Sequence, residues 1–65
     1  MFVDVVTVDD EEYYKERIYI NLGQMSYFCP ESLELHMISG EVFKLQKQSS
    51  ERLLNLLEFS KENIY

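Results

Sequence analysis

The spacing of apolar residues changes once along the chain, from every second residue to every third or fourth. In residues 17–22 the apolar side chains Ile18, Ile20 and Leu22 alternate with polar or aromatic ones, which is typical of a half-buried strand. After Ser49 the spacing becomes that of an amphipathic helix, with one apolar face. This order of patterns constrains the chain to a set of strands followed by a C-terminal helix.

The residue composition of two further segments predicts that each forms a strand. Residues 2–8 are rich in β-branched types and apolar on both faces, so we expect this strand to be covered on both faces. Residues 25–29 form a short apolar segment after Gly23. Pro30 must end that segment or place it at a sheet edge, because proline donates no backbone hydrogen bond.

A β-hairpin is predicted over residues 33–46. The alternation of apolar and polar residues is interrupted at residues 38–40, and Gly40 in the left-handed conformation would close a three-residue loop there. This loop fixes a register in which apolar residues lie opposite one another, Leu33 with Leu45 and Leu35 with Phe43,. The same register places the acidic Glu34 opposite the basic Lys44,.

A helix is predicted over residues 50–62. Ser49 and Ser50 are good N-cap residues, Glu51 suits the first turn, and no glycine or proline follows,. The apolar face centred on Leu53 is unusually wide, so either the helix lies deep on a curved sheet or part of it meets another chain. The predicted fold is therefore one α+β domain over residues 1–65: a small antiparallel β-meander of about four to five short strands, followed by one C-terminal amphipathic helix packed on the sheet.

The small size of the chain raises the question of what stabilises it. One core of 65 residues rarely leaves more than about 3–5 kcal/mol of net stability. Cys29 is the only cysteine, so an internal disulfide is excluded and a reducing cytoplasm is expected. Cys29 and His36 are too few for a zinc site, and we expect no metal and no cofactor. Self-association, as a homodimer, is the remaining means of stabilisation.

No stretch of the sequence approaches the length of a membrane span, and the first residues lack the basic region of a signal peptide,. We therefore expect neither membrane insertion nor a targeting signal.

Acidic residues dominate the first part of the chain. The formal net charge is −6, from 12 acidic and 6 basic residues, and the basic residues are dispersed. Direct binding to nucleic acid is therefore not expected. A solvated loop is the simplest interpretation of the acidic run; binding a divalent cation or presenting charge to a basic partner are the alternatives. The candidate acidic contact surface is Asp9, Asp10, Glu11, Glu12 and Glu16.

Catalytic arrangements are few. Cys29 with His36 as its base is the one nucleophile pair that the sequence offers,. No third residue that would orient His36 is evident, so a structural role for both is preferred and an enzyme is not expected.

The five tyrosines point to an interaction surface, because tyrosine is enriched at interface anchors. Tyr19 projects from the polar side of its strand. The candidate partner interface joins strand and loop tyrosines to two residues of the helix: Tyr13, Tyr14, Tyr19, Leu54 and Phe59.

The segments Ile18 to Leu22, Met25 to Phe28 and Leu33 to Gly40, with the leucine-rich closing helix, resemble small flagellar proteins of the FlbD/SwrD type. Residues 17–58 also resemble the first half of LytTR-type DNA-binding domains. Both resemblances imply an arrangement of short strands followed by a helix. Neither carries a catalytic motif or a residue role to this chain.

These observations favour a non-enzymatic protein-interaction module, self-associating, that presents a Tyr-rich sheet face or helix flank to a protein partner. The alternative is an acidic inhibitor of the kind carried by phages and mobile elements, which mimics nucleic acid and occupies a basic groove of a host protein.

Overall fold

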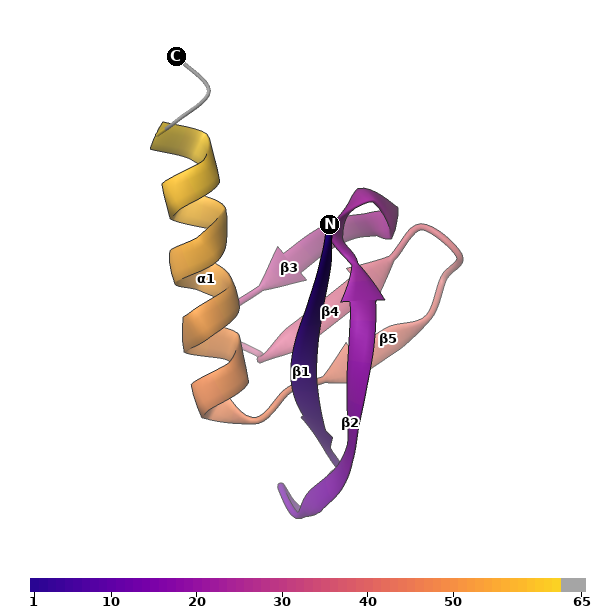
Figure 1. Ribbon diagram of the computed structural model, residues 1–65. Coiled ribbons are helices and arrows are strands. Elements are labelled where there is room, and N and C mark those ends of the chain that lie inside the picture. The colour runs from indigo at the N-terminus through magenta and orange to yellow at the C-terminus, as the bar shows by residue number, and fades with distance from the viewer. Residues whose placement is uncertain (63–65) are drawn as a thin grey trace.

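A computed structural model describes residues 1–62, with side chains through residue 58. Five antiparallel strands and a short 3₁₀ helix precede one long helix, so the predicted α+β fold is confirmed (Figure 1). The elements are β1 (Phe2–Val8), β2 (Tyr14–Asn21), η1 (Leu22–Gln24), β3 (Met25–Cys29), β4 (Glu34–Met37), β5 (Val42–Lys44) and α1 (Lys47–Glu62).

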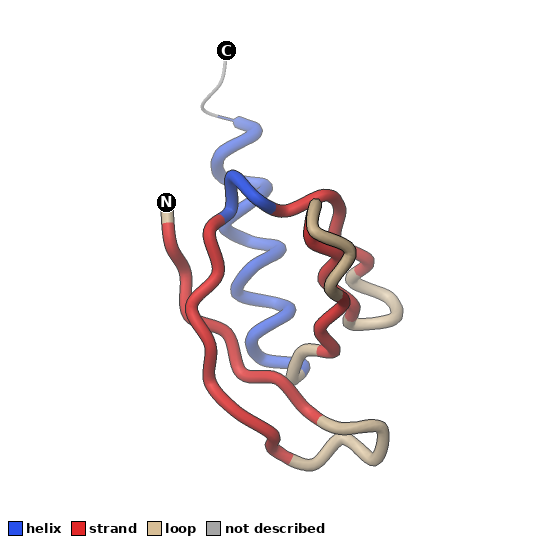
Figure 2. The backbone as a smooth tube through the Cα atoms, turned by 90° about the vertical axis from the view of Figure 1, so that its right-hand side faces the viewer, coloured by secondary structure: helices blue, strands red, loops and turns tan. Residues whose placement is uncertain are grey.

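The strands form two sheets, β1–β2 and β3–β4–β5. A single bridge between Thr7 and Leu45 links them, and the backbone N–H of Gln46 donates to the carbonyl of Val6 at 2.8 Å. Figure 2 shows α1 passing behind the gap between the two sheets. The segment that follows β5 therefore reaches the edge of β1 that faces away from β2.

The predicted hairpin register is confirmed. Leu35 pairs with Phe43 and Glu34 with Lys44, and Gly40 has a φ of 97°, a conformation that glycine adopts without steric cost. Leu33 precedes β4 with a φ of 62°, although its carbonyl accepts a hydrogen bond from Leu45 N–H at 2.8 Å. The strand thus begins one residue later than the alternation predicts.

The second strand differs at both ends from the prediction over residues 17–22. It begins earlier, at Tyr14, because β1 extends far enough to give it a pairing partner in Val8. It ends before Leu22, which opens η1 while the Asn21 side chain accepts a hydrogen bond from Gly23 N–H. By contrast, the predicted bounds of β1 and β3 are confirmed.

The helix begins three residues earlier than predicted, at Lys47. Ser50 N–H donates to the Gln46 carbonyl at 2.9 Å, which puts Gln46, and neither serine, at the position before the first turn. Ser49 and Ser50 lie inside that turn and are buried. The prediction that a serine caps the helix was wrong, because contacts with β1 decide where α1 starts.

The core is a single cluster between the sheets and the helix: Val5, Ile20, Leu35, Leu45 and Leu53. Val5 and Ile20 belong to the inner face of the β1–β2 hairpin, and the other three residues pack against that face. The expectation that β1 is covered on both faces was wrong at Phe2, whose surface is 68% exposed, because this cluster packs only against the inner face. On α1, Leu53 is 2% exposed, whereas Leu54, Leu56 and Leu57 are only partly buried.

Candidate functional site

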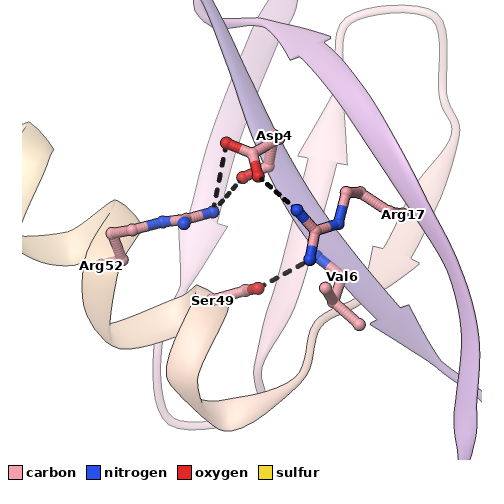
Figure 3. Close-up of polar contacts among 5 residues, drawn as sticks. All are labelled: Asp4, Val6, Arg17, Ser49 and Arg52. Atoms are coloured by element: carbon pink, nitrogen blue, oxygen red, sulfur yellow. Dashed lines mark hydrogen bonds and ion pairs between the residues drawn. The ribbon is translucent and has the colours of Figure 1, made fainter.

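The flank of α1 that meets β1 carries hydrogen-bonding groups at three-residue spacing. Gln46 N–H donates to the Val6 carbonyl, and one turn later the Ser49 hydroxyl accepts from Val6 N–H at 2.9 Å. Another three residues along, the guanidinium of Arg52 donates to the carbonyl of Asp4 (Figure 3). Residues three apart lie on one side of a helix, so this flank follows the strand edge.

These bonds establish which backbone groups of β1 face the helix. In an antiparallel strand, successive residues direct their backbone groups to opposite edges. Val6 and Asp4 direct theirs toward α1, whereas the Met1 carbonyl accepts from Leu22 N–H on the other edge. The N–H and C=O of Phe2 and the N–H of Asp4 therefore face the α1 side as well. An uncovered stretch of such groups is where another strand can pair.

One carboxylate is shared by two arginines beside this edge. The Asp4 carboxylate lies 3.3 Å from Arg17 Nη1 and 3.4 Å from Arg52 Nη2, so it joins β2 and α1 through β1 (Figure 3). The side chains of Arg17 and Arg52 are 60% and 61% exposed, and pairs this exposed contribute at most about 1 kcal/mol each. The cluster carries one net positive charge in a chain of net charge −6.

Beyond Arg52, a groove of about 490 Å³ lies between β1 and α1. We call it the β1–α1 groove. Its walls are mainly apolar, and Asp4, Ser49, Arg52 and Asn55 supply its polar groups. The lining residues are Met1, Val3, Asp4, Val5, Ser49, Arg52, Leu53, Asn55 and Leu56.

A second recess, of about 300 Å³, adjoins this groove and shares Asp4, Ser49 and Arg52 with it. It is mainly polar and adds Val6, Arg17, Gln46 and Gln48. An apolar groove that runs into an arginine-lined recess fits a ligand with an apolar part next to a negative charge.

The predicted tyrosine surface is exposed but is not one patch. Tyr13, Tyr14 and Tyr19 are 68%, 66% and 72% exposed, so the outward orientation of Tyr19 is confirmed. Tyr19 lies opposite Asp4 and Tyr14 opposite Val8, and five residues of strand separate the two by about 17 Å. Leu54 is partly buried on α1. The side chain of Phe59 lies outside the described residues.

The predicted acidic surface lies at the other end of the β1–β2 hairpin from the groove. Asp9, Asp10, Glu11 and Glu12 are exposed in the connecting turn, and Glu16 is exposed on β2. Asp9 also shapes the turn, because its carboxylate accepts hydrogen bonds from the N–H groups of Glu11 and Tyr13. Among the residues that the structure describes, no group of three or more histidine, cysteine or acidic side chains is placed to hold a metal ion.

His36 is held by contacts that the sequence did not reveal. Its ring stacks on Tyr27 with centroids 4.1 Å apart, and its Nε2 lies 3.2 Å from Glu34 Oε1. The strand partner of Cys29 is Glu34, while His36 pairs with Tyr27. These neighbours give His36 a structural place on the outer face of the β3–β4–β5 sheet.

The residues that form the groove were missed in the sequence. Asp4, Ser49 and Arg52 each have an ordinary local explanation as a surface charge or a helix residue. The one local signal was the three-residue spacing of Ser49 and Arg52 beside the leucine stripe, and it does not say which strand this flank meets.

Comparisons with protein-family models, curated proteins and solved structures give no match for this chain. The resemblances to FlbD/SwrD-type proteins and to LytTR-type domains remain predictions. None of the helices described here is long and apolar enough to span a bilayer.

Proposed function

We propose that this protein is a non-enzymatic protein-interaction module that self-associates and presents a flank of α1 to its partner. The observation that carries this proposal is the incomplete cover of the helix. Of the leucines on α1, all of which the structure describes, Leu53 alone is buried, while Leu54, Leu56 and Leu57 are partly exposed, and an apolar groove lies open beside β1. Partly exposed apolar side chains next to a groove are typical of protein contact surfaces.

The size of the core supports self-association. Six hydrophobic residues are buried among those that the structure describes, and Cys29, a free thiol, cannot form an internal bridge. A second copy packed against the flank of α1 that carries Leu54, which does not line the groove, would bury further apolar surface and add stability that a core of this size lacks. A reducing cytoplasm, in which Cys29 stays a thiol, belongs to the same proposal. A flagellar partner is the version that the FlbD/SwrD resemblance favours.

The experiment is the molar mass in solution by light scattering at moderate and high salt. A dimer that persists in high salt supports an apolar interface, because screening weakens contacts between exposed charges. A folded monomer at all concentrations overturns self-association.

The acidic-inhibitor function is a second candidate, favoured by the exposure of every acidic residue in the β1–β2 turn. Salt also separates this candidate from the first. A charge mimic loses its partner steeply above about 0.2 M salt, and reversing the charges of Asp9, Asp10, Glu11 and Glu12 abolishes its binding. An apolar contact through α1 survives both treatments.

A further inference from the structure

We propose that the β1–α1 groove binds an extended, acidic segment of a partner protein, which adds to β1 as a strand. This inference rests on the proposed interaction function and names the chemistry of the partner. It does not depend on self-association. Three features carry it: a strand edge beside the groove, the apolar wall of the groove, and the cluster of net positive charge that Asp4, Arg17 and Arg52 form where the groove meets the second recess.

The first feature is the strand edge. Among the residues that the structure describes, the bonds from Gln46, Ser49 and Arg52 occupy this edge only as far as the Asp4 carbonyl. The N–H of Asp4 and both backbone groups of Phe2 face the same side; Asp4 also lines the groove, as do Met1 and Val3 on either side of Phe2. A partner strand would satisfy these groups by main-chain hydrogen bonds, as in other cases of strand addition.

The second feature is the apolar wall. Val3, Leu53 and Leu56 line the groove on the inner side of β1, and Leu56 is only partly buried. Alternate side chains of a strand point to opposite faces. In a strand paired with Phe2 and Asp4, one side chain would therefore lie over these residues, and an aliphatic side chain suits that position.

The third feature is the charge. The neighbouring side chains of the same strand would point outward, toward the cluster in which Arg17 and Arg52 share one carboxylate. A guanidinium has five N–H donors, and the contacts of Arg52 with other described residues, both to Asp4, use Nη2 alone. Its Nη1 and Nε remain to bind a partner carboxylate, which the net positive charge of the cluster attracts. The preferred segment therefore alternates aliphatic and acidic residues.

The test uses the full chain, labelled with ¹⁵N, and three capped hexapeptides. The first alternates isoleucine and glutamate, the second replaces every glutamate by glutamine, and the third keeps the glutamates but carries N-methyl groups on alternate backbone amides. Binding is measured by titration in NMR spectra and by fluorescence anisotropy. We expect the first peptide to shift the amide resonances of Phe2, Val3 and Asp4. We expect the glutamine peptide to bind about fivefold more weakly and the N-methylated peptide not to bind.

A matched pair of variants tests whether Arg52 causes the preference for the glutamate peptide over the glutamine peptide. Arg52→Gln should lower the affinity for the glutamate peptide to that for the glutamine peptide. Lys15→Gln removes the same charge from an exposed residue of β2 that lines neither recess, and it should keep the preference.

Decanoate, an apolar chain with one carboxylate, is titrated as a fourth probe. Three results would overturn the inference: no shift at the β1 edge, equal binding of the glutamate and glutamine peptides, or binding of decanoate in the groove without binding of any peptide. The mass measurement is independent of these titrations. If the protein is a dimer and binds no peptide, the strand-addition site is overturned and the proposed function stands. If it is a monomer and binds the glutamate peptide, only self-association is overturned.

Discussion

The hydroxyl of Ser49 accepts a hydrogen bond at 2.9 Å from the backbone N–H of Val6, which lies 43 residues earlier in the chain. The bond joins the first turn of α1 to the edge of β1. Val6 also takes part in a second hydrogen bond, in which its carbonyl accepts from Gln46 N–H. The start of the helix is thus fixed by a strand at the opposite end of the sequence.

Replacing Ser49 with alanine should lower the free energy of unfolding by about 1–3 kcal/mol, because Val6 N–H would lose its partner at a partly buried site. Urea unfolding followed by circular dichroism measures this change. Ser50→Ala is the matched control, since Ser50 is equally buried in the same turn and no side-chain hydrogen bond to Val6 depends on it. Equal losses in both variants would show that the Ser49–Val6 bond contributes nothing of its own.

The sequence predicted most of the fold because the signals involved are local. In the β4–β5 hairpin, side-chain alternation and a glycine with positive φ together leave one sensible register. Pro30 correctly predicted the end of β3 at Cys29. Each of these features depends on residues that lie within a few positions of one another.

The errors and the missed site have a common cause, which is contact between distant segments. Serines at residues 49 and 50 look like helix caps locally, but Val6 uses one of them and the helix begins at Lys47. The groove likewise requires Met1–Val5 to meet Ser49–Leu56. No pattern in the sequence states which flank of the helix faces which strand, so Arg52 and Asp4 were not singled out.

Gly40 should resist substitution on conformational grounds alone. Its φ is 97°, and a Cβ added there would meet nothing within 4 Å, so a loss of stability cannot come from a clash. Gly40→Ala should cost about 1 kcal/mol or more of unfolding free energy, measured by thermal or urea unfolding. Gly40→Asn should cost less, since asparagine tolerates the left-handed region better. An alanine variant as stable as the parent protein would contradict the positive φ.

Leu53 should be the most sensitive residue of α1. It is 2% exposed within the core cluster, and Leu→Ala changes at such sites cost about 2–5 kcal/mol. That loss matches the whole net stability expected for a core of this size, so Leu53→Ala should be largely unfolded at 25 °C by circular dichroism and by NMR dispersion. Leu56→Ala, on the partly exposed groove wall, should remain folded. A folded Leu53→Ala chain would mean that α1 contributes little to the core.

Leu54 separates self-association from folding. It is partly buried and lies outside the core cluster and the residues packed against it, so Leu54→Gln should leave the circular dichroism spectrum and the unfolding midpoint of the dissociated chain nearly unchanged. If the flank of α1 that carries Leu54 forms the dimer contact, this variant should shift the light-scattering mass from dimer to monomer, because a buried glutamine at an apolar interface loses its hydration without gaining a partner. Glu51→Gln is the control, since Glu51 is an exposed residue one turn earlier on the same helix, and it should keep the mass of the parent protein. A Leu54→Gln chain that folds and keeps the dimer mass would remove this flank from the interface and direct the search to the outer sheet face that carries Tyr19.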